Sequence, residues 1–174
     1  MPAMTNRFLW AIALCVLLAG AASHAQTRTD EYTRYELQPP GTSAVKITYE
    51  ASAITEGART FTNDIAPTAR VSDIVVHDMM TGQPLKFVAS ARSIAVTLAR
   101  PVPQRGQGRV RIEKTVVDAK AYTRVGDGGT FTVPLGAGRH DLVLPPGYEL
   151  TACNIPVRVL AEDDGRTKLD LMNV

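Results

Sequence analysis

The stretch Val45-Lys-Ile-Thr-Tyr-Glu-Ala-Ser-Ala53 indicates the fold class of this 174-residue chain. Apolar residues at every second position alternate with polar ones, which is the pattern of a β-strand with one face in a core. The same alternation returns at Ile94–Leu98 and at Val110–Val116, where Lys114 occupies one of the inward positions. No window after residue 25 has sustained apolar spacing of the helical kind, so we expect helices to be short or absent.

Gly- and Pro-containing turns separate the predicted strands. Thr81-Gly82 lies between the apolar runs Val71–Met79 and Leu85–Val88, which predicts a hairpin. The polar segment Glu162–Arg166 predicts a second hairpin between runs at 157–160 and 168–172. Further short strands are expected at Thr130–Val133, Leu142–Leu144 and Tyr148–Cys153.

About nine or ten short strands with turns every 8–12 residues are typical of a β-sandwich. The predicted fold class is therefore all-β, with a single antiparallel β-sandwich over residues 42–174. Residues 26–41 are expected to be an extended lead-in, whose Tyr35 and Leu37 join an edge strand.

The segment Met1–Ala25 has the organisation of a signal peptide. Arg7 precedes the apolar run Phe8–Ala22, and Ser23-His-Ala25 offers a small-x-small cleavage site. The run is shorter than the roughly 18–20 residues that span a bilayer, which disfavours the alternative of a permanent anchor. In Leu18-Ala-Gly-Ala21 the position of a lipid-modified cysteine holds alanine, so the protein is not expected to be a lipoprotein. We expect cleavage after Ala25, export as a soluble periplasmic or secreted protein, and no stable membrane insertion.

Removal of the signal peptide changes the net charge of the chain and the number of residues that could form a functional site. The chain has 19 Lys and Arg against 17 Asp and Glu, and loss of Arg7 leaves 18 against 17. Such a balance predicts no nucleic-acid partner. The remaining chain has no Trp, two histidines (His77 and His140) and one cysteine, Cys153, so an internal disulfide cannot form. A lone thiol in an oxidising compartment is either buried, which is the usual case for cysteine, or available for intermolecular chemistry.

Recognisable catalytic motifs are missing from the sequence. His77 and His140 are too far apart for a His-Glu-x-x-His zinc motif, and there is no Gly-x-Ser-x-Gly elbow or Walker loop. Gly126-Asp-Gly128 begins like a dinucleotide fingerprint but lacks the third glycine. We therefore expect no catalytic residues and no cofactor.

Three weaker candidate sites remain. The polar, glycine-rich stretch Ala119–Thr130 predicts a loop, in which Tyr122, Arg124 and Asp127 are candidate binding residues. Exposed edge strands are a further possibility, because they can recruit an extended peptide.

His77, Met79 and Met80 form the second candidate site. Imidazole and thioether ligands suit copper, which would make the chain a periplasmic metal-handling protein. The alternative is that His77 ends a strand and the methionines fill a core edge. In the third candidate, Cys153 pairs with His140 as a thiol-dependent enzyme, which requires the two side chains to be in hydrogen-bond reach.

Several short stretches carry a resemblance to a known family. They are Asp78–Phe87, Val96–Val102, Gly108–Lys114, Leu144-Pro-Pro-Gly-Tyr-Glu-Leu150 and Asp164-Gly-Arg166. In this order they resemble the N-terminal β-sandwich of M1-type zinc aminopeptidases, and also exported bacterial β-sandwich proteins of unknown function, over Tyr35–Met172. The resemblance implies a fold and an export route. It argues against peptidase activity, because the family's zinc motif lies in another domain. The expected function is an exported, non-catalytic binding or accessory module whose partner is an envelope protein or peptide.

Overall fold

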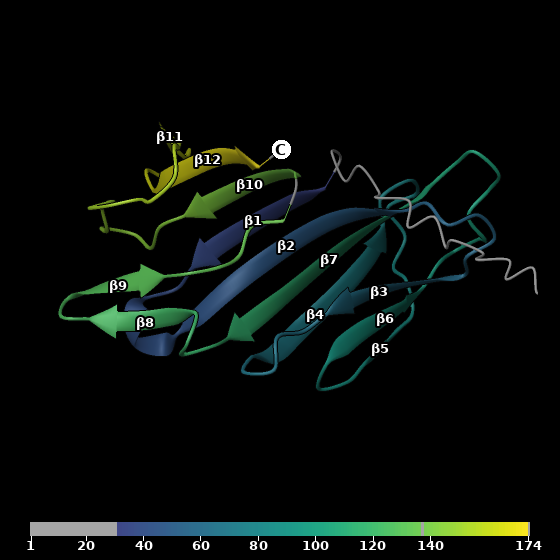
Figure 1. Ribbon diagram of the computed structural model, residues 1–174, viewed down its shortest axis with the longest axis horizontal. Helices are drawn as coiled ribbons and strands as arrows, with labels where there is room; N and C mark the ends of the chain where they lie inside the picture. Colours follow the sequence, from purple (N-terminus) through teal and green to yellow (C-terminus); the bar gives the residue numbers. More distant parts are fainter. Residues whose placement is uncertain (1–30, 137, 174) are drawn as a thin grey trace, which may run out of the picture.

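The computed structural model describes residues 31–136 and 138–173, which form the β-rich body in Figure 1. The predicted signal peptide, Met1–Ala25, lies outside the described residues. Within them, the single helical element is the short 3₁₀-helix η1 (Pro40–Thr42), and no helix is long and apolar enough to cross a membrane.

Seven strands form one large, curved sheet in the order β11-β12-β10-β1-β2-β7-β4. In chain order these strands are β1 (Tyr32–Leu37), β2 (Ala44–Ala53), β4 (Arg70–Asp78), β7 (Gly108–Val117), β10 (Gly138–Val143), β11 (Arg158–Ala161) and β12 (Thr167–Asn173). All neighbouring pairs in this sheet are antiparallel except β1 and β10, which run parallel. Figure 1 shows the long strands β2 and β7 crossing the middle of the molecule.

Two smaller units cover the inner face of the large sheet. The first is a three-stranded sheet of β3 (Thr60–Asp64), β6 (Ser93–Thr97) and β5 (Phe87–Ala89), with β6 in the middle. The second is the hairpin β8 (Tyr122–Val125) and β9 (Gly128–Phe131). In Figure 1 the small sheet lies at the lower right, beside β4, and the hairpin lies at the lower left, near the end of β7.

Each covering unit has its own hydrophobic core. Beneath the small sheet, the inward residues of β2 and β7 pack with the buried Ile94 and Val96 of β6. Beneath the hairpin, Tyr35 and Val45 pack with the buried Tyr122. The alternation of β2 and β7 therefore supplies one continuous inner face, which two separate units cover. This arrangement confirms the all-β, sandwich-like fold class.

Four local expectations were wrong. The strand containing Tyr35 and Leu37 is not at an edge, since β1 lies between β2 and β10. The Thr81-Gly82 turn forms, with Leu85 N–H donating to the Val76 carbonyl, but Phe87–Ala89 then leaves β4 and joins the small sheet. Two further differences concern strand content. Tyr148–Cys153 is irregular, although Tyr148 and Leu150 pack on the core under the hairpin. The stretch Ala119–Thr130 is mostly the β8–β9 hairpin rather than a loop.

The outer face of the large sheet carries a network of ion pairs. Arg34 of β1 reaches Glu162 at 3.0 Å and Glu36 at 2.9 Å, and Arg166 reaches Glu36 at 3.1 Å. These contacts lower the pKa of the Glu162 carboxyl, with the Arg34 hydrogen bond as the largest cause. The network ties the turn between β11 and β12 to the central strand β1.

Candidate functional site

A groove runs along the inner face of the large sheet, where the small sheet and the β8–β9 hairpin leave it uncovered. It consists of two adjoining cavities of about 470 and 230 Å³. Tyr35, Ile47, Asp64 and Lys114 line both cavities, so these residues mark the junction between them. A combined space of this size falls in the range of about 300–1,000 Å³ that is usual for ligand sites.

The two cavities differ in chemical character. The larger one is bordered mainly by hydroxyl, amide and charged groups, from Glu31, Thr33, Ser52, Thr55, Thr60, Thr62, Asn63, Asp64, Lys114 and His140. The smaller one is mainly apolar, and its walls include Val45, Ile65, Ala69, Val71, Val116, Phe131 and Val133. The groove therefore has a polar compartment and an apolar compartment that meet at Lys114.

Lys114 lies on the inward face of β7, between the apolar positions Ile112 and Val116. Its ammonium group donates a hydrogen bond to Oδ1 of Asn63, which belongs to β3 of the small sheet. Burial lowers the pKa of Lys114 to about 8, because the charged form loses solvation. Among the described residues no carboxylate forms an ion pair with this ammonium. The groove thus contains a partly buried cation whose one described hydrogen-bond partner is a neutral amide.

His140 of β10 borders the polar compartment and is only 5% exposed. Its Nε2–H donates to the Gly136 carbonyl at 2.9 Å, and the ring stacks on Tyr35 with centroids 6.3 Å apart. Nδ1 is buried and has no hydrogen-bond partner among the described residues. Because Nε2 carries the proton in the neutral ring, Nδ1 is an acceptor that lacks a donor. Such a group is costly to bury unless a ligand or water satisfies it.

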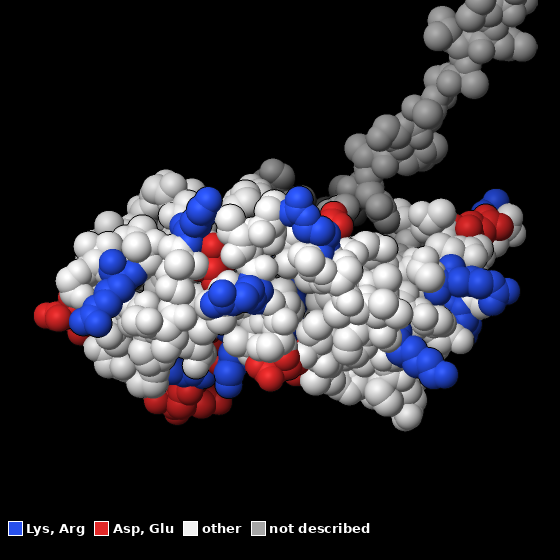
Figure 2. All heavy atoms as spheres, turned by 90° about the horizontal axis from the view of Figure 1, so that it is seen from below, with Lys and Arg blue, Asp and Glu red and all other residues white. Residues whose placement is uncertain are grey.

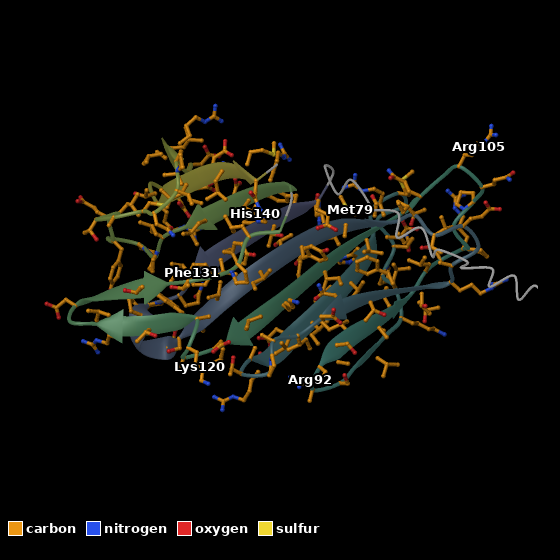
Figure 3. The ribbon with its side chains drawn as sticks, viewed as in Figure 1. Met79, Arg92, Arg105, Lys120, Phe131 and His140 are labelled. Atoms are coloured by element: carbon orange, nitrogen blue, oxygen red, sulfur yellow. The ribbon has the colours of Figure 1, made fainter. Side chains whose placement is uncertain are left out.

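Aromatic rings form the wall of the apolar compartment. Phe131 of β9 lies 5.6 Å from Tyr35 and 6.0 Å from Tyr122, measured between ring centroids. Figure 3 shows Phe131 and His140 in the half of the molecule that holds β1, β10 and the hairpin, with Met79 apart from them. The rings therefore give this compartment rigid apolar surfaces.

The candidate binding residues on the predicted loop lie in the hairpin. Tyr122 is buried, and its hydroxyl donates to the Gln38 carbonyl at 2.8 Å. Arg124 is exposed and donates to the Gly126 carbonyl at 2.9 Å. Gly126, with φ of 58°, and the exposed Asp127 form the two-residue turn. Of the three candidates, Tyr122 lines the groove, whereas the structure places Arg124 and Asp127 on the hairpin surface.

The His77, Met79 and Met80 cluster lies at the end of β4. His77 is opposite Arg111 of β7, and Met80 is 60% exposed. The Met79 sulfur accepts a hydrogen bond from Arg109 at 3.9 Å, so a cationic guanidinium adjoins the thioether. The copper hypothesis remains a prediction. Copper titration of the wild type against a variant with His77→Ala, Met79→Leu and Met80→Leu tests it, and equal binding by both would eliminate it.

Cys153 is exposed, so of the two alternatives for the lone thiol the usual one, burial, does not hold. It lies in the irregular segment between β10 and β11, where no strand pairing draws the chain onto the sheet. The contacts found for His140 are to Gly136 and Tyr35, not to Cys153. The described contacts therefore do not include the thiol–imidazole pair expected between Cys153 and His140.

Sequence reasoning missed the groove residues Lys114, Asn63 and His140 as a set. The one available signal is Lys114 itself, a charged residue at an apolar position of the β7 alternation. Nothing in the sequence places Asn63 or His140 beside it, because they come from different strands more than 20 residues away on either side.

Comparison with solved structures identifies the fold. The chain superimposes on a variant of a two-domain M1 zinc metallopeptidase bound to L-arginine, with a TM-score of 0.57 and 16% identity. A structure described as an M1 zinc metallopeptidase from Deinococcus radiodurans gives 0.56 and 16%. The chain has the fold of the N-terminal domain of these peptidases. In both cases 82% of this chain is covered, but only 38% and 37% of the respective peptidases.

The likeness to M1 zinc metallopeptidases concerns the fold alone. This chain matches the N-terminal domain of these peptidases and not their catalytic domain. No protein-family model matches the chain, and no curated protein matches it in sequence.

Surface charge adds no second site on the face that Figure 2 shows. There, Lys and Arg occur in several separate groups, interspersed with Asp and Glu among uncharged atoms. Among the described residues no three or more His, Cys, Asp or Glu side chains are grouped as metal ligands would be. The groove is accordingly the strongest candidate for a functional site.

Proposed function

We propose that this chain is an exported, non-catalytic binding module that holds its ligand in the groove. The single observation that carries this proposal is the buried, unpartnered Nδ1 of His140 in a groove that also contains the Lys114 cation. On folding, His140 Nδ1 loses solvation without gaining a donor, and the Lys114 ammonium gains only the neutral Asn63 amide as an acceptor. A ligand that supplies those partners would recover part of this cost.

The fold supports an accessory rather than a catalytic role. The domain that this chain resembles in M1 zinc metallopeptidases is not the catalytic one. The expected thiol–imidazole pair is not found among the described contacts of the groove, because Cys153 is exposed and does not line it, and His140 contacts Gly136 and Tyr35. Export rests on the composition of Met1–Ala25, which has a basic start, an apolar run and a small-x-small end.

A ligand-capture experiment tests the groove. The exported protein is incubated with the low-molecular-weight and peptide fraction of an envelope extract, and retained compounds are identified by mass spectrometry. Ala69 lines the apolar compartment, so Ala69→Phe is expected to fill it and abolish retention. The matched control is Ala91→Phe in the exposed turn between β5 and β6, with thermal unfolding used to verify that both variants fold.

Retention by the wild type and Ala91→Phe, with loss in folded Ala69→Phe, supports the groove as the binding site. Equal retention by all three proteins, or by none, overturns the proposal. Specific hydrolysis of an aminoacyl p-nitroanilide by the purified protein would contradict the non-catalytic assignment.

A further inference from the structure

We infer that the groove takes the carboxyl terminus of a peptide whose last residue is apolar. The inference rests on the proposed function and specifies its ligand. The terminal carboxylate would lie at Lys114, the last side chain would fill the apolar compartment, and the preceding backbone would cross the polar compartment toward His140.

The positive charge of Lys114, at the junction of the two compartments, favours an anionic group on the ligand. Lys114 lies where the two compartments meet, and its described hydrogen-bond partner is the neutral Asn63 amide. An ammonium has three donors, so the Asn63 contact leaves two for a ligand. A carboxylate satisfies these donors and also neutralises a charge that is costly to bury alone.

The apolar compartment beside Lys114 favours an apolar group on the same ligand. The apolar compartment has about 230 Å³. A dry cavity of roughly 150 Å³ already binds benzene in another protein, so this compartment can hold a branched aliphatic or single-ring side chain. Its aromatic wall of Tyr35, Phe131 and Tyr122 provides flat contact surfaces for such a group.

The polar compartment distinguishes a peptide from a simple apolar acid. His140 Nδ1 is an acceptor without a donor, and a peptide N–H can supply one whereas an alkyl chain cannot. The strand register places His140 opposite Thr33, Thr33 opposite Tyr49, and Tyr49 opposite Ile112, two residues from Lys114. Three strand spacings and two residues along the strand correspond to about 16 Å, or about five extended residues. A peptide of this length links the two groups.

The charges that line the groove further restrict the ligand. Asp64 and Lys114 both border the junction of the two compartments, so Lys114 compensates the terminal carboxylate beside Asp64. The described lining of the polar compartment includes no lysine or arginine besides Lys114, so a second acidic residue in the peptide would meet no further cation of this kind there. Neutral residues are therefore expected before the apolar terminus.

Fluorescence polarisation with synthetic hexapeptides tests the inference. The probe is an N-terminally labelled Gly-Ser-Ala-Ser-Ala-Leu with a free carboxylate. Comparison peptides carry a C-terminal amide or end in Asp, and unlabelled octanoate serves as a competitor that represents a free apolar acid. The proteins are the wild type, Lys114→Met and Lys46→Met, since Lys46 is an exposed lysine on the opposite face of neighbouring β2.

We expect the free-acid Leu peptide to bind the wild type and Lys46→Met. Amidation or Lys114→Met should weaken binding by at least about 30-fold, as expected when one partner of a buried charge pair is removed. Equal binding of acid and amide overturns the terminal-carboxylate assignment. If octanoate displaces the labelled peptide at concentrations as low as those at which the unlabelled peptide does, the ligand is a free apolar acid and the peptide assignment is overturned. Absence of binding by every probe also overturns it. The proposed function then depends only on ligand capture, which uses no chosen peptide.

Discussion

Replacement of Lys114 by methionine is expected to stabilise the protein while removing the proposed ligand anchor. Burial shifts the pKa of Lys114 from 10.5 to about 8. This corresponds to a cost of roughly 3 kcal/mol for keeping the ammonium charged in the folded state. The hydrogen bond to Asn63 has a charged donor, so its loss costs about 2 kcal/mol. Lys114→Met should therefore raise the free energy of unfolding at neutral pH by about 1 kcal/mol, and the melting temperature by about 3 °C.

The pH dependence of this gain has a defined sign. Below about pH 8 both the folded and the unfolded protein carry the Lys114 proton, so the wild type bears the full cost. Between about pH 8 and pH 10.5 the folded state loses that proton while the unfolded state keeps it. Because the unfolded state then binds more protons, wild-type stability rises with pH in this window. The advantage of Lys114→Met should shrink accordingly.

Urea unfolding from about pH 7.5 to about pH 9.5 measures the effect. The upper limit avoids the tyrosines, because burial raises the pKa values of Tyr35 and Tyr122, and titration of these groups has the opposite sign. Lys46→Met is the control and should not change the pH slope. A Lys114→Met protein that is less stable than the wild type at pH 7.5, or whose advantage is constant with pH, would refute the reasoning.

Three further predictions concern other parts of the chain. Gly138 has φ of 117°, and a Cβ there would lie 2.5 Å from the Glu31 carbonyl oxygen. Gly138→Ala should therefore lower the free energy of unfolding, measured with urea, by about 2–4 kcal/mol, and a decrease below about 0.5 kcal/mol would contradict the β10 geometry. Cys153 is exposed, so Ellman's reagent should titrate one thiol without denaturant in a protein of residues 26–174, which lacks Cys15, and a requirement for denaturant would contradict the exposed position. Protein exported by a bacterial host should have the mass of residues 26–174, whereas retention of Met1–Ala25 would exclude cleavage.

Local alternation predicts most of the strands but not their partners. Val45–Ala53 forms β2, and the Glu162–Arg166 turn joins β11 to β12 as expected. The position of β1 could not be predicted in this way. Its parallel partner β10 lies over 100 residues later, and period-2 alternation is the same for a central strand with a polar outer face as for an edge strand.

Apolar alternation also predicts too many strand residues where no neighbouring strand is available for backbone hydrogen bonds. Tyr148 and Leu150 both pack on the core, so the apolar pattern around them reports burial correctly. Their segment is nevertheless irregular, because no neighbouring strand pairs with it there. Burial of side chains and formation of a hydrogen-bonded ladder are separate requirements, and only the first is visible in the sequence.

The sequence by itself determined the alternation that makes this chain all-β and the charged Lys114 at an inward position of β7. Tertiary structure alone decided that Asn63 and His140 share a groove with Lys114, and that two covering units leave this groove open. The physical reason is that side-chain direction along a strand follows from local backbone geometry, whereas sheet order and layer packing follow from contacts between residues far apart in the chain.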